Sequence, residues 1–160
     1  MSCYLFTYHA YRSWMPDRPQ GYVRRHEGIL SSDREMARLY ARKDKHDMVR
    51  ILSDVQLEAI ATLQEAVCHI GCRLLFVATD STHVHSVVSW VGERTWLQNR
   101  TSLKRSLTIT LKQKFGKRPW LSEGASRKQV RDQAHFDYLV TQYLPKHSGW
   151  KWDERRGLFK

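Results

Sequence analysis

The pattern of apolar and polar residues in the first half of the chain predicts a strand, a charged segment and a long helix. Residues 4–11 are dense in aromatic and β-favouring side chains, which predicts a first strand. Residues 13–50 are charged and carry prolines, so we expect a loop there, followed by a polar helix from about Asp33. Apolar side chains then recur at helical spacing over residues 57–70, which predicts the first long helix.

The second half continues with the same kinds of element. Two β-rich runs, residues 73–78 and 83–90, are separated by turn residues and predict a strand pair. A second long helix is expected over residues 95–115, where leucines recur at every fourth position. Residues 118–130 have room for a last strand or hairpin, and a final helix is expected over residues 132–144, before a proline.

The starts of the two long helices carry the same local signal. Ser53 stands three residues before Gln56, and Thr95 stands three residues before Gln98. In a capping box, the hydroxyl of the first residue accepts a hydrogen bond from the backbone of the fourth, whose side chain returns the bond. We therefore expect a capping box at both helix starts.

The order of these elements indicates an α+β fold. Strand, helix, strand, strand, helix, strand and a further helix is the order of a ferredoxin-like antiparallel sheet with both long helices on one face. A chain of 160 residues is long enough for one core and too short for two. We expect a single domain over residues 1–160, with a charged insertion at about 15–50 and a tail rich in tryptophan, lysine and arginine at about 145–160.

The charge balance points to a polyanionic partner. Lysine and arginine number 27 against 16 aspartate and glutamate residues, a net charge of +11 that favours nucleic acid first and an anionic membrane surface second. No run of about 18 apolar residues and no signal peptide is visible, so we expect no membrane span. Cys3, Cys68 and Cys72 are too few for a disulfide scaffold and lack zinc-finger spacing, which is typical of reduced thiols in the cytoplasm.

Two histidines on the third predicted strand are the first candidate for chemistry. His83 and His85 stand two residues apart, and side chains at that spacing project from the same face of a strand. Both imidazoles can therefore bind one metal ion. The same pattern is also compatible with two polar side chains on a solvated strand face.

The final predicted helix carries the second candidate. Tyr138 and Gln142 are four residues apart, which brings the phenol and the amide to within about 40° of each other around a helix axis. Ordinary pairs on helix surfaces have the same spacing. A second tyrosine, Tyr143, is turned about 140° from Tyr138 on an α-helix, so we expect it to be a packing residue.

In this order, the histidine pair and the tyrosine helix resemble a known family. Together with the opening residues 7–25, they resemble the HUH endonucleases, specifically the single-tyrosine transposases of small bacterial insertion sequences and their REP-associated relatives. The resemblance covers about residues 4–144. It implies the HUH endonuclease fold, in which a C-terminal helix beside the ferredoxin-like sheet carries the tyrosine.

The resemblance also implies a metal-dependent transesterase that acts on single-stranded DNA. Tyr138 would be the nucleophile, and His83, His85 and Gln142 would bind a divalent metal ion, Mg²⁺ or Mn²⁺. Attack by the tyrosine would give a 5′-phosphotyrosine intermediate that retains the energy needed for rejoining. The family further implies recognition of DNA hairpins, a homodimer, and a place in the prokaryotic cytoplasm or nucleoid.

Side chains that bind DNA are predicted on the second long helix and in the tail. Cations on the helix would neutralise phosphates, and the indoles of the tail would stack on unpaired bases. The alternatives are a solvated helix face and tryptophans that seal the core or a dimer interface. The candidates are Arg100, Lys104, Arg105, Lys112, Trp150 and Trp152.

Two other functions stay open from the sequence alone. One is another HUH nuclease, a replication initiator or a relaxase, although most relaxases are longer. The other is a basic nucleic-acid-binding module without catalysis. Dependence on divalent ions separates this last function, because passive phosphate binding weakens with added salt and gains nothing specific from Mn²⁺.

Overall fold

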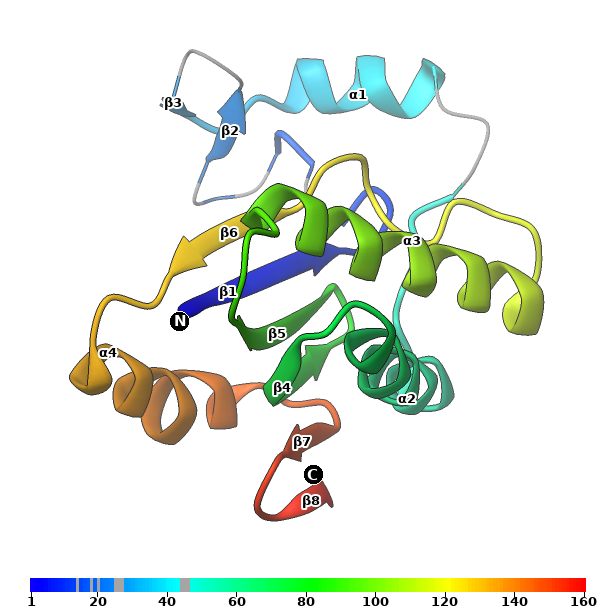
Figure 1. Cartoon of the computed structure of the whole chain (residues 1–160). Helices are drawn as coiled ribbons and strands as arrows, with labels where there is room; N and C mark the ends of the chain where they lie inside the picture. The colour runs from blue at the N-terminus through cyan, green and yellow to red at the C-terminus, as the bar shows by residue number, and fades with distance from the viewer. Residues whose placement is uncertain (14, 18, 20, 25–27, 44–46) are drawn as a thin grey trace.

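The computed structural model describes the chain except for residues 14, 18, 20, 25–27 and 44–46. Figure 1 shows its strands and helices in chain order. The strands are β1 (Ser2–His9), β2 (Tyr22–Arg24), β3 (Gly28–Leu30), β4 (Arg73–Asp80), β5 (His83–Trp90), β6 (Ser126–Gln129), β7 (Lys151–Asp153) and β8 (Gly157–Phe159). The helices are α1 (Arg34–Lys43), α2 (Ser53–His69), α3 (Trp96–Phe115) and α4 (Gln133–Tyr138), and α4 continues into a π-helical turn, η1 (Leu139–Tyr143), and a 3₁₀ turn, η2 (Leu144–Lys146).

Six strands form one antiparallel sheet in the order β6-β1-β5-β4-β7-β8. The four strands expected from the sequence are β1, β4, β5 and β6, and β1 and β5 lie side by side in the middle of these four. Along this central pair, His9 lies opposite His83 and Thr7 lies opposite His85. The prediction of a ferredoxin-like α+β fold is therefore confirmed.

The two long helices cover one face of the sheet. Leu63 of α2 and Leu107 of α3 are fully buried in one cluster with Phe6 of β1 and Val84 of β5. Burying a leucine side chain to this degree stabilises the fold by about 1.5–3 kcal/mol. The apolar periodicity that predicted both helices thus corresponds to the faces that pack on the sheet.

The C-terminal helix covers the opposite face. Leu139 and Leu144 are buried in a second cluster with Phe76 of β4 and Val87 of β5. Side chains alternate between the two faces along a strand, so the histidines at odd positions of β5 share the face of Val87. The strand that carries the histidines therefore presents them to the side on which the C-terminal helix lies.

The described residues of the charged segment at about 15–50 include two short strands and a helix. β2 and β3 form a separate antiparallel pair. The side chain of Asp33 accepts a hydrogen bond from the backbone N–H of Met36 at 2.8 Å, and α1 begins directly behind it. The polar helix expected from about Asp33 is confirmed, and Figure 1 shows it at the opposite end of the molecule from β7 and β8.

The C-terminal part differs most from the prediction. Helical backbone continues past Pro145, which lies in the first turn of η2, where a missing N–H leaves no hydrogen bond unmade. The residues after it do not form a simple tail. They form the hairpin β7–β8, which pairs with β4 and extends the sheet.

Only one of the two expected capping boxes forms. Thr95 and Gln98 make both hydrogen bonds of the box at the start of α3. At the start of α2, the hydroxyl of Ser53 instead accepts a hydrogen bond from the indole N–H of Trp150 at 2.7 Å. The amide of Gln56 donates to the carbonyl oxygen of residue 51 at 2.8 Å. The prediction at Ser53 is therefore wrong, because α2 begins at Ser53 with Leu52 as its N-cap, and the N–H of Gln56 bonds to the carbonyl oxygen of Leu52 at 2.8 Å.

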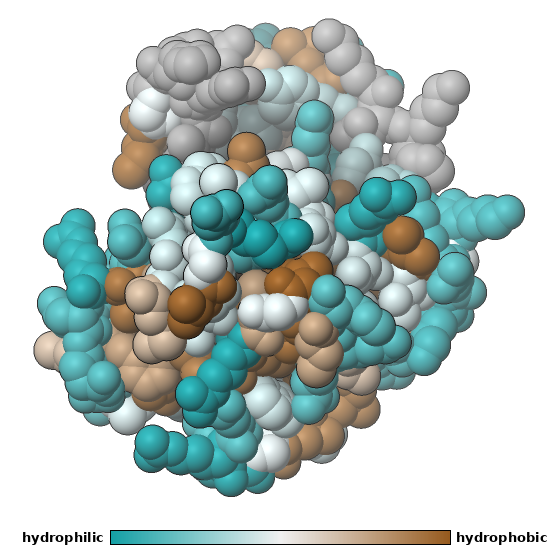
Figure 2. All heavy atoms as spheres, in the orientation of Figure 1, coloured by the Kyte–Doolittle hydropathy of each residue, from teal (hydrophilic) through white to brown (hydrophobic). Residues whose placement is uncertain are grey.

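The surface mixes polar and apolar side chains. In the view of Figure 2, hydrophilic side chains extend around the rim, and hydrophobic groups occupy smaller areas between them. The well exposed hydrophobic residues include Ile29, Val91 and Leu158. Within the described part of the chain, no helix combines the length and the apolar character that crossing a bilayer requires.

Candidate functional site

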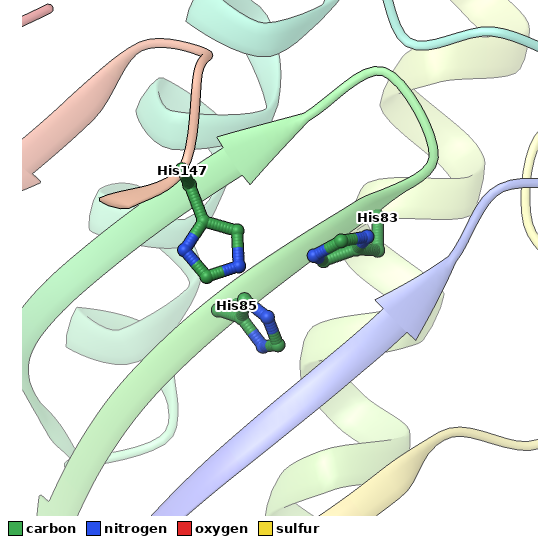
Figure 3. A group of neighbouring side chains, drawn as sticks. All are labelled: His83, His85 and His147. Atoms are coloured by element: carbon green, nitrogen blue, oxygen red, sulfur yellow. The ribbon is translucent and has the colours of Figure 1, made fainter. Parts of the chain in front are cut away.

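Three imidazoles converge on the sheet face that the C-terminal helix covers. The ring centroids of His83 and His85 lie 4.6 Å apart on β5. His147, in the loop after η2, lies 5.2 Å from His83 and 4.6 Å from His85. Figure 3 shows the three rings facing one another, and the nitrogens that they offer lie within 4.8 Å of each other. In the described part of the chain, no other group of three or more histidine, cysteine or acidic side chains lies so close together.

His85 is the most enclosed of the three. His85 is only 4 % exposed. Burial, with smaller effects from His83 and His147, lowers the pKa of its imidazole to about 2. The imidazole is therefore neutral at physiological pH. Its Nδ1 lies 2.7 Å from Oγ1 of Thr7, and its buried Nε2 has no hydrogen-bond partner among the described residues. A buried nitrogen without a partner is costly, and a metal ion would satisfy it.

His147 is held so that one ring nitrogen is available. Its Nδ1 lies 3.0 Å from the carbonyl oxygen of Leu144. A carbonyl only accepts, so Nδ1 must carry the hydrogen, and in the neutral ring Nε2 keeps its lone pair. The Nδ1 of His83 is similarly engaged, 2.8 Å from the hydroxyl of Thr82. Imidazoles that are oriented by a hydrogen bond at the other ring nitrogen are typical of histidine ligands, so the positions of these residues fit a divalent metal ion.

Tyr143 lies against two of the three histidines. Its ring centroid lies 5.7 Å from that of His85 and 5.4 Å from that of His147. Tyr138 is 52 % exposed, and among the described residues no ring contact joins it to the three histidines. Gln142 is exposed on the same turn as Tyr143. The roles of Tyr138 and Gln142 stay predictions.

The π-helical turn explains why Tyr143 is near the histidines. The N–H of Leu144 bonds to the carbonyl oxygen of Leu139, five residues earlier, and both leucines are buried against the sheet. In this turn, residues five apart share a face, whereas α-helical geometry turns them about 140° apart. The expectation that Tyr143 is turned about 140° from Tyr138 assumes α-helical geometry, which this turn does not have. Its ring does pack, but it packs against those of His85 and His147. π-Helical turns are frequent at functional sites.

His147 is not among the metal ligands predicted from the sequence. Tyr143 and His147 repeat the four-residue spacing of Tyr138 and Gln142, so the signal was present. A final helix that ends before Pro145, as the sequence predicts, leaves His147 outside it. His9 was also missed, and its ring lies 6.1 Å from that of His83 on the neighbouring strand.

The basic residues of α3 divide into two groups. The guanidinium of Arg100 donates to the carbonyl oxygen of Ala125, and the ammonium of Lys104 donates to that of Ser122 at 2.6 Å. Both side chains thereby fasten the segment that leads from α3 to β6. Arg105 and Lys112 are exposed instead. Contact with phosphate stays a prediction for all four.

The two tryptophans of the tail pack partly against the protein itself. Trp150 and Trp152 are half-buried and lie against the cluster beneath α2 and α3. The indole N–H of Trp150 is bonded to Ser53. These contacts give the indoles a role in fixing the hairpin β7–β8, and base stacking stays a prediction.

Comparison with known proteins finds likeness in structure alone. Neither a protein-family profile nor a curated protein matches the sequence. A REP-associated tyrosine transposase bound to a REP hairpin matches with a TM-score of 0.50 and 7% identity, over 90% of this chain and 70% of that one. A candidate transposase from Deinococcus radiodurans R1 matches with a TM-score of 0.53 and 12% identity, over 92% of this chain and 91% of that one. The chain thus has the fold of these two proteins.

Proposed function

We propose that this chain is a metal-dependent transposase that cleaves and rejoins single-stranded DNA through a tyrosine. The observation that carries the proposal is the position of His83 and His85. They lie side by side on a central strand, on the face covered by the tyrosine-bearing helix, in a chain with the fold of a tyrosine transposase. The net charge of +11 suits a polyanionic substrate.

The chemistry follows from the weakness of a phenol as a nucleophile. With an ordinary pKa of about 10, a tyrosine is almost entirely protonated at neutral pH. A divalent ion, Mg²⁺ or Mn²⁺, would supply Lewis-acid polarisation of the scissile phosphate, and His83 and His85 would hold it. His85, neutral and hydrogen-bonded to Thr7, is prepared for this role.

The proposed step keeps the phosphodiester energy. The phenolic oxygen forms a bond to phosphorus, and the bond from phosphorus to the 3′ oxygen breaks. The phenol loses a proton and the departing 3′ oxygen gains one, so the products are a 5′-phosphotyrosine and a free 3′-hydroxyl. Attack by a 3′-hydroxyl reverses the step and rejoins DNA without ATP.

We propose Tyr138 as the nucleophile and Gln142 as an oxygen ligand of the metal, on their spacing and on the resemblance described above. Tyr143 is the competing nucleophile, because its ring lies next to those of His85 and His147. Both tyrosines are at least one-third exposed, so DNA can reach either of them.

The proposal also includes the form of the DNA and of the enzyme. One structural neighbour is described with a REP hairpin bound, which supports a hairpin-bearing strand as the substrate. A homodimer is proposed from the family resemblance. Light scattering of the purified chain, with and without a hairpin oligonucleotide, measures the assembly state directly.

The decisive experiment looks for a covalent adduct. A pool of hairpin-bearing single-stranded oligonucleotides, labelled at the 3′ end, is incubated with the protein and Mn²⁺ and resolved under denaturing conditions. We expect a labelled protein band that EDTA, His83→Ala and Tyr138→Phe abolish, and that Tyr143→Phe leaves in place. The opposite result for the two tyrosines would move the nucleophile to Tyr143. No adduct, with DNA binding indifferent to Mn²⁺, would favour a non-catalytic binding module.

A further inference from the structure

A buried lysine fastens the loop that carries His147. Lys151 is only 5 % exposed. Its Nζ donates hydrogen bonds to the carbonyl oxygen of His147 at 2.8 Å and to that of Gly149 at 2.9 Å. Lysine is rarely buried unless its ammonium is paired, and here two backbone carbonyls satisfy it. These two hydrogen bonds offset the cost of burying the ammonium group, and they also hold the loop in place.

The rest of this loop is fixed to the body of the protein. The N–H of Gly149 bonds to the carbonyl oxygen of Thr79 at 3.0 Å, and the N–H of Trp150 bonds to the side chain of Gln56 at 3.1 Å. A Cβ atom at Gly149 would lie 2.4 Å from the carbonyl oxygen of Thr79. Only glycine allows this close approach of the loop to β4.

We propose that His147 is a nitrogen ligand of the metal site and that Lys151 is the residue that positions it. This inference rests on the metal site of the proposed function. The carbonyl oxygen of Leu144 orients the imidazole of His147 through Nδ1, and Lys151 bonds to the backbone carbonyl of His147. Both the side chain and the backbone of His147 are therefore held. The ligands predicted from the sequence were two imidazoles and the amide of Gln142, and His147 adds a third imidazole to them.

A third imidazole changes which cation the site prefers. Mg²⁺ favours oxygen ligands and keeps much of its water, whereas Mn²⁺, Co²⁺ and Zn²⁺ accept several nitrogens. We therefore expect the chain to bind Mn²⁺ and Co²⁺ more tightly than Mg²⁺. Loss of His147 reduces that preference, because it removes a nitrogen and leaves the oxygen ligands in place.

The test measures metal binding directly, without DNA. The full chain is freed of metal and titrated with Mn²⁺ by calorimetry and with Co²⁺ by its visible spectrum. His147→Ala and Lys151→Met are each expected to weaken binding about 10–100-fold, the usual effect of losing a ligand or its supporting partner. Lys146→Met, which removes an exposed lysine next to His147, is the matched control and binds as the parent does.

The double variant distinguishes positioning from a general loss of structure. If Lys151 acts through His147, His147→Ala with Lys151→Met binds metal no more weakly than His147→Ala alone. Additive losses would overturn the positioning role, and so would parental affinity in Lys151→Met. Parental affinity in His147→Ala would overturn the ligand role.

Two further variants keep the result interpretable. If circular dichroism shows that Lys151→Met is poorly folded, Lys151→Arg replaces it. Arginine retains hydrogen-bond donors at this position, so Lys151→Arg should keep part of the metal affinity. In that case His147→Ala, at a half-buried side chain, still decides the ligand role. His83→Ala separates this inference from the proposed function. If it binds metal as the parent does, the whole metal site is wrong, whereas if it alone loses binding, only the role of His147 and Lys151 is wrong.

Discussion

Oγ1 of Thr7 and Nδ1 of His85 lie 2.7 Å apart across the central strand pair β1 and β5. Thr7 is 7 % exposed and faces the histidine directly in the register of the two strands. The hydroxyl fixes the orientation of the imidazole. With Nδ1 as the hydrogen-bond donor, the lone pair of His85 is on Nε2, the buried nitrogen that has no protein partner among the described residues.

Thr7→Val should therefore weaken metal binding while the fold persists. Valine has nearly the same shape as threonine, so the sheet keeps its packing, but the imidazole loses the bond that orients it. We expect Mn²⁺ affinity to fall about 10-fold or more, measured by calorimetry. Thr101→Val, at an exposed position of α3, is the control. Unchanged affinity in Thr7→Val would mean that the hydroxyl does not orient the ligand.

Gly149→Ala should destabilise the loop that carries His147. The added methyl group meets the carbonyl oxygen of Thr79 at 2.4 Å and the amide oxygen of Gln56 at 2.8 Å, so the backbone must move. We expect the free energy of unfolding to fall by about 1–3 kcal/mol, measured by urea titration, together with weaker metal binding. Ser148→Ala, at the exposed neighbouring position, should change neither quantity by a comparable amount.

The basic residues of α3 should separate into DNA contacts and structural contacts. Arg105→Ser and Lys112→Ser remove exposed charges, so each should lower the affinity for single-stranded DNA and reduce the slope of log K against log salt by about 0.7. Lys104→Met should instead lower the free energy of unfolding by about 1–3 kcal/mol, because it removes the bond to Ser122. Fluorescence anisotropy at several salt concentrations measures the first effect. An unaltered salt dependence in both serine variants would exclude α3 as a phosphate-binding helix.

The three free cysteines should differ in reactivity with alkylating reagents. Burial raises the pKa of the Cys3 thiol from 9.0 to about 11, whereas Cys68 is exposed. The thiolate is the reactive species, so at pH 8 Cys3 should react about 100-fold more slowly than an ordinary thiol. Its rate should rise about tenfold per pH unit up to pH 11. Mass spectrometry of timed iodoacetamide reactions gives both values.

The same pKa shift sets the sign of its effect on stability. The folded chain holds the Cys3 proton more tightly than the unfolded chain does. Between about pH 9 and pH 11 the unfolded state ionises first, so the free energy of unfolding should decrease as the pH rises. The contribution is fully present below pH 9. A Cys3→Ala variant should show a smaller decrease, because burial also raises the pKa values of Cys72 and Tyr8, and these two groups keep their own contributions.

The sheet and the two long helices could be predicted because their signals are local. The apolar spacing of α2 and α3, and the two-residue spacing of His83 and His85, need only the geometry of one helix or one strand. At Thr95 the capping box forms as the sequence predicts. At Ser53 the same pattern fails, because Leu52 and not Ser53 is the N-cap, and the hydroxyl of Ser53 instead accepts a hydrogen bond from Trp150, almost 100 residues away in the chain.

Only part of the candidate site could be predicted, because only part of it depends on local signals in the sequence. His83 and His85 are brought together by one strand, whereas Tyr143 and His147 reach them through a π-helical turn and a loop fixed by Lys151. A π-helical turn changes which residues share a face, and no local pattern in the sequence announces it. The anchoring of His147 by Lys151 depends on the hairpin β7–β8 pairing with β4, which is a tertiary event.

The position of Lys151 has a consequence for the order in which the protein matures. Translation proceeds from the N-terminus, so β1, β4 and β5, with Thr7 and two of the histidines, emerge from the ribosome well before the loop of His147. The growing chain thus contains the two imidazoles of β5 before it contains His147, and the proposed three-nitrogen centre can be completed only when synthesis has passed Lys151. A premature stop codon just after Leu144 would release a chain that contains β1, β4, β5 and β6 but lacks β7, β8 and His147.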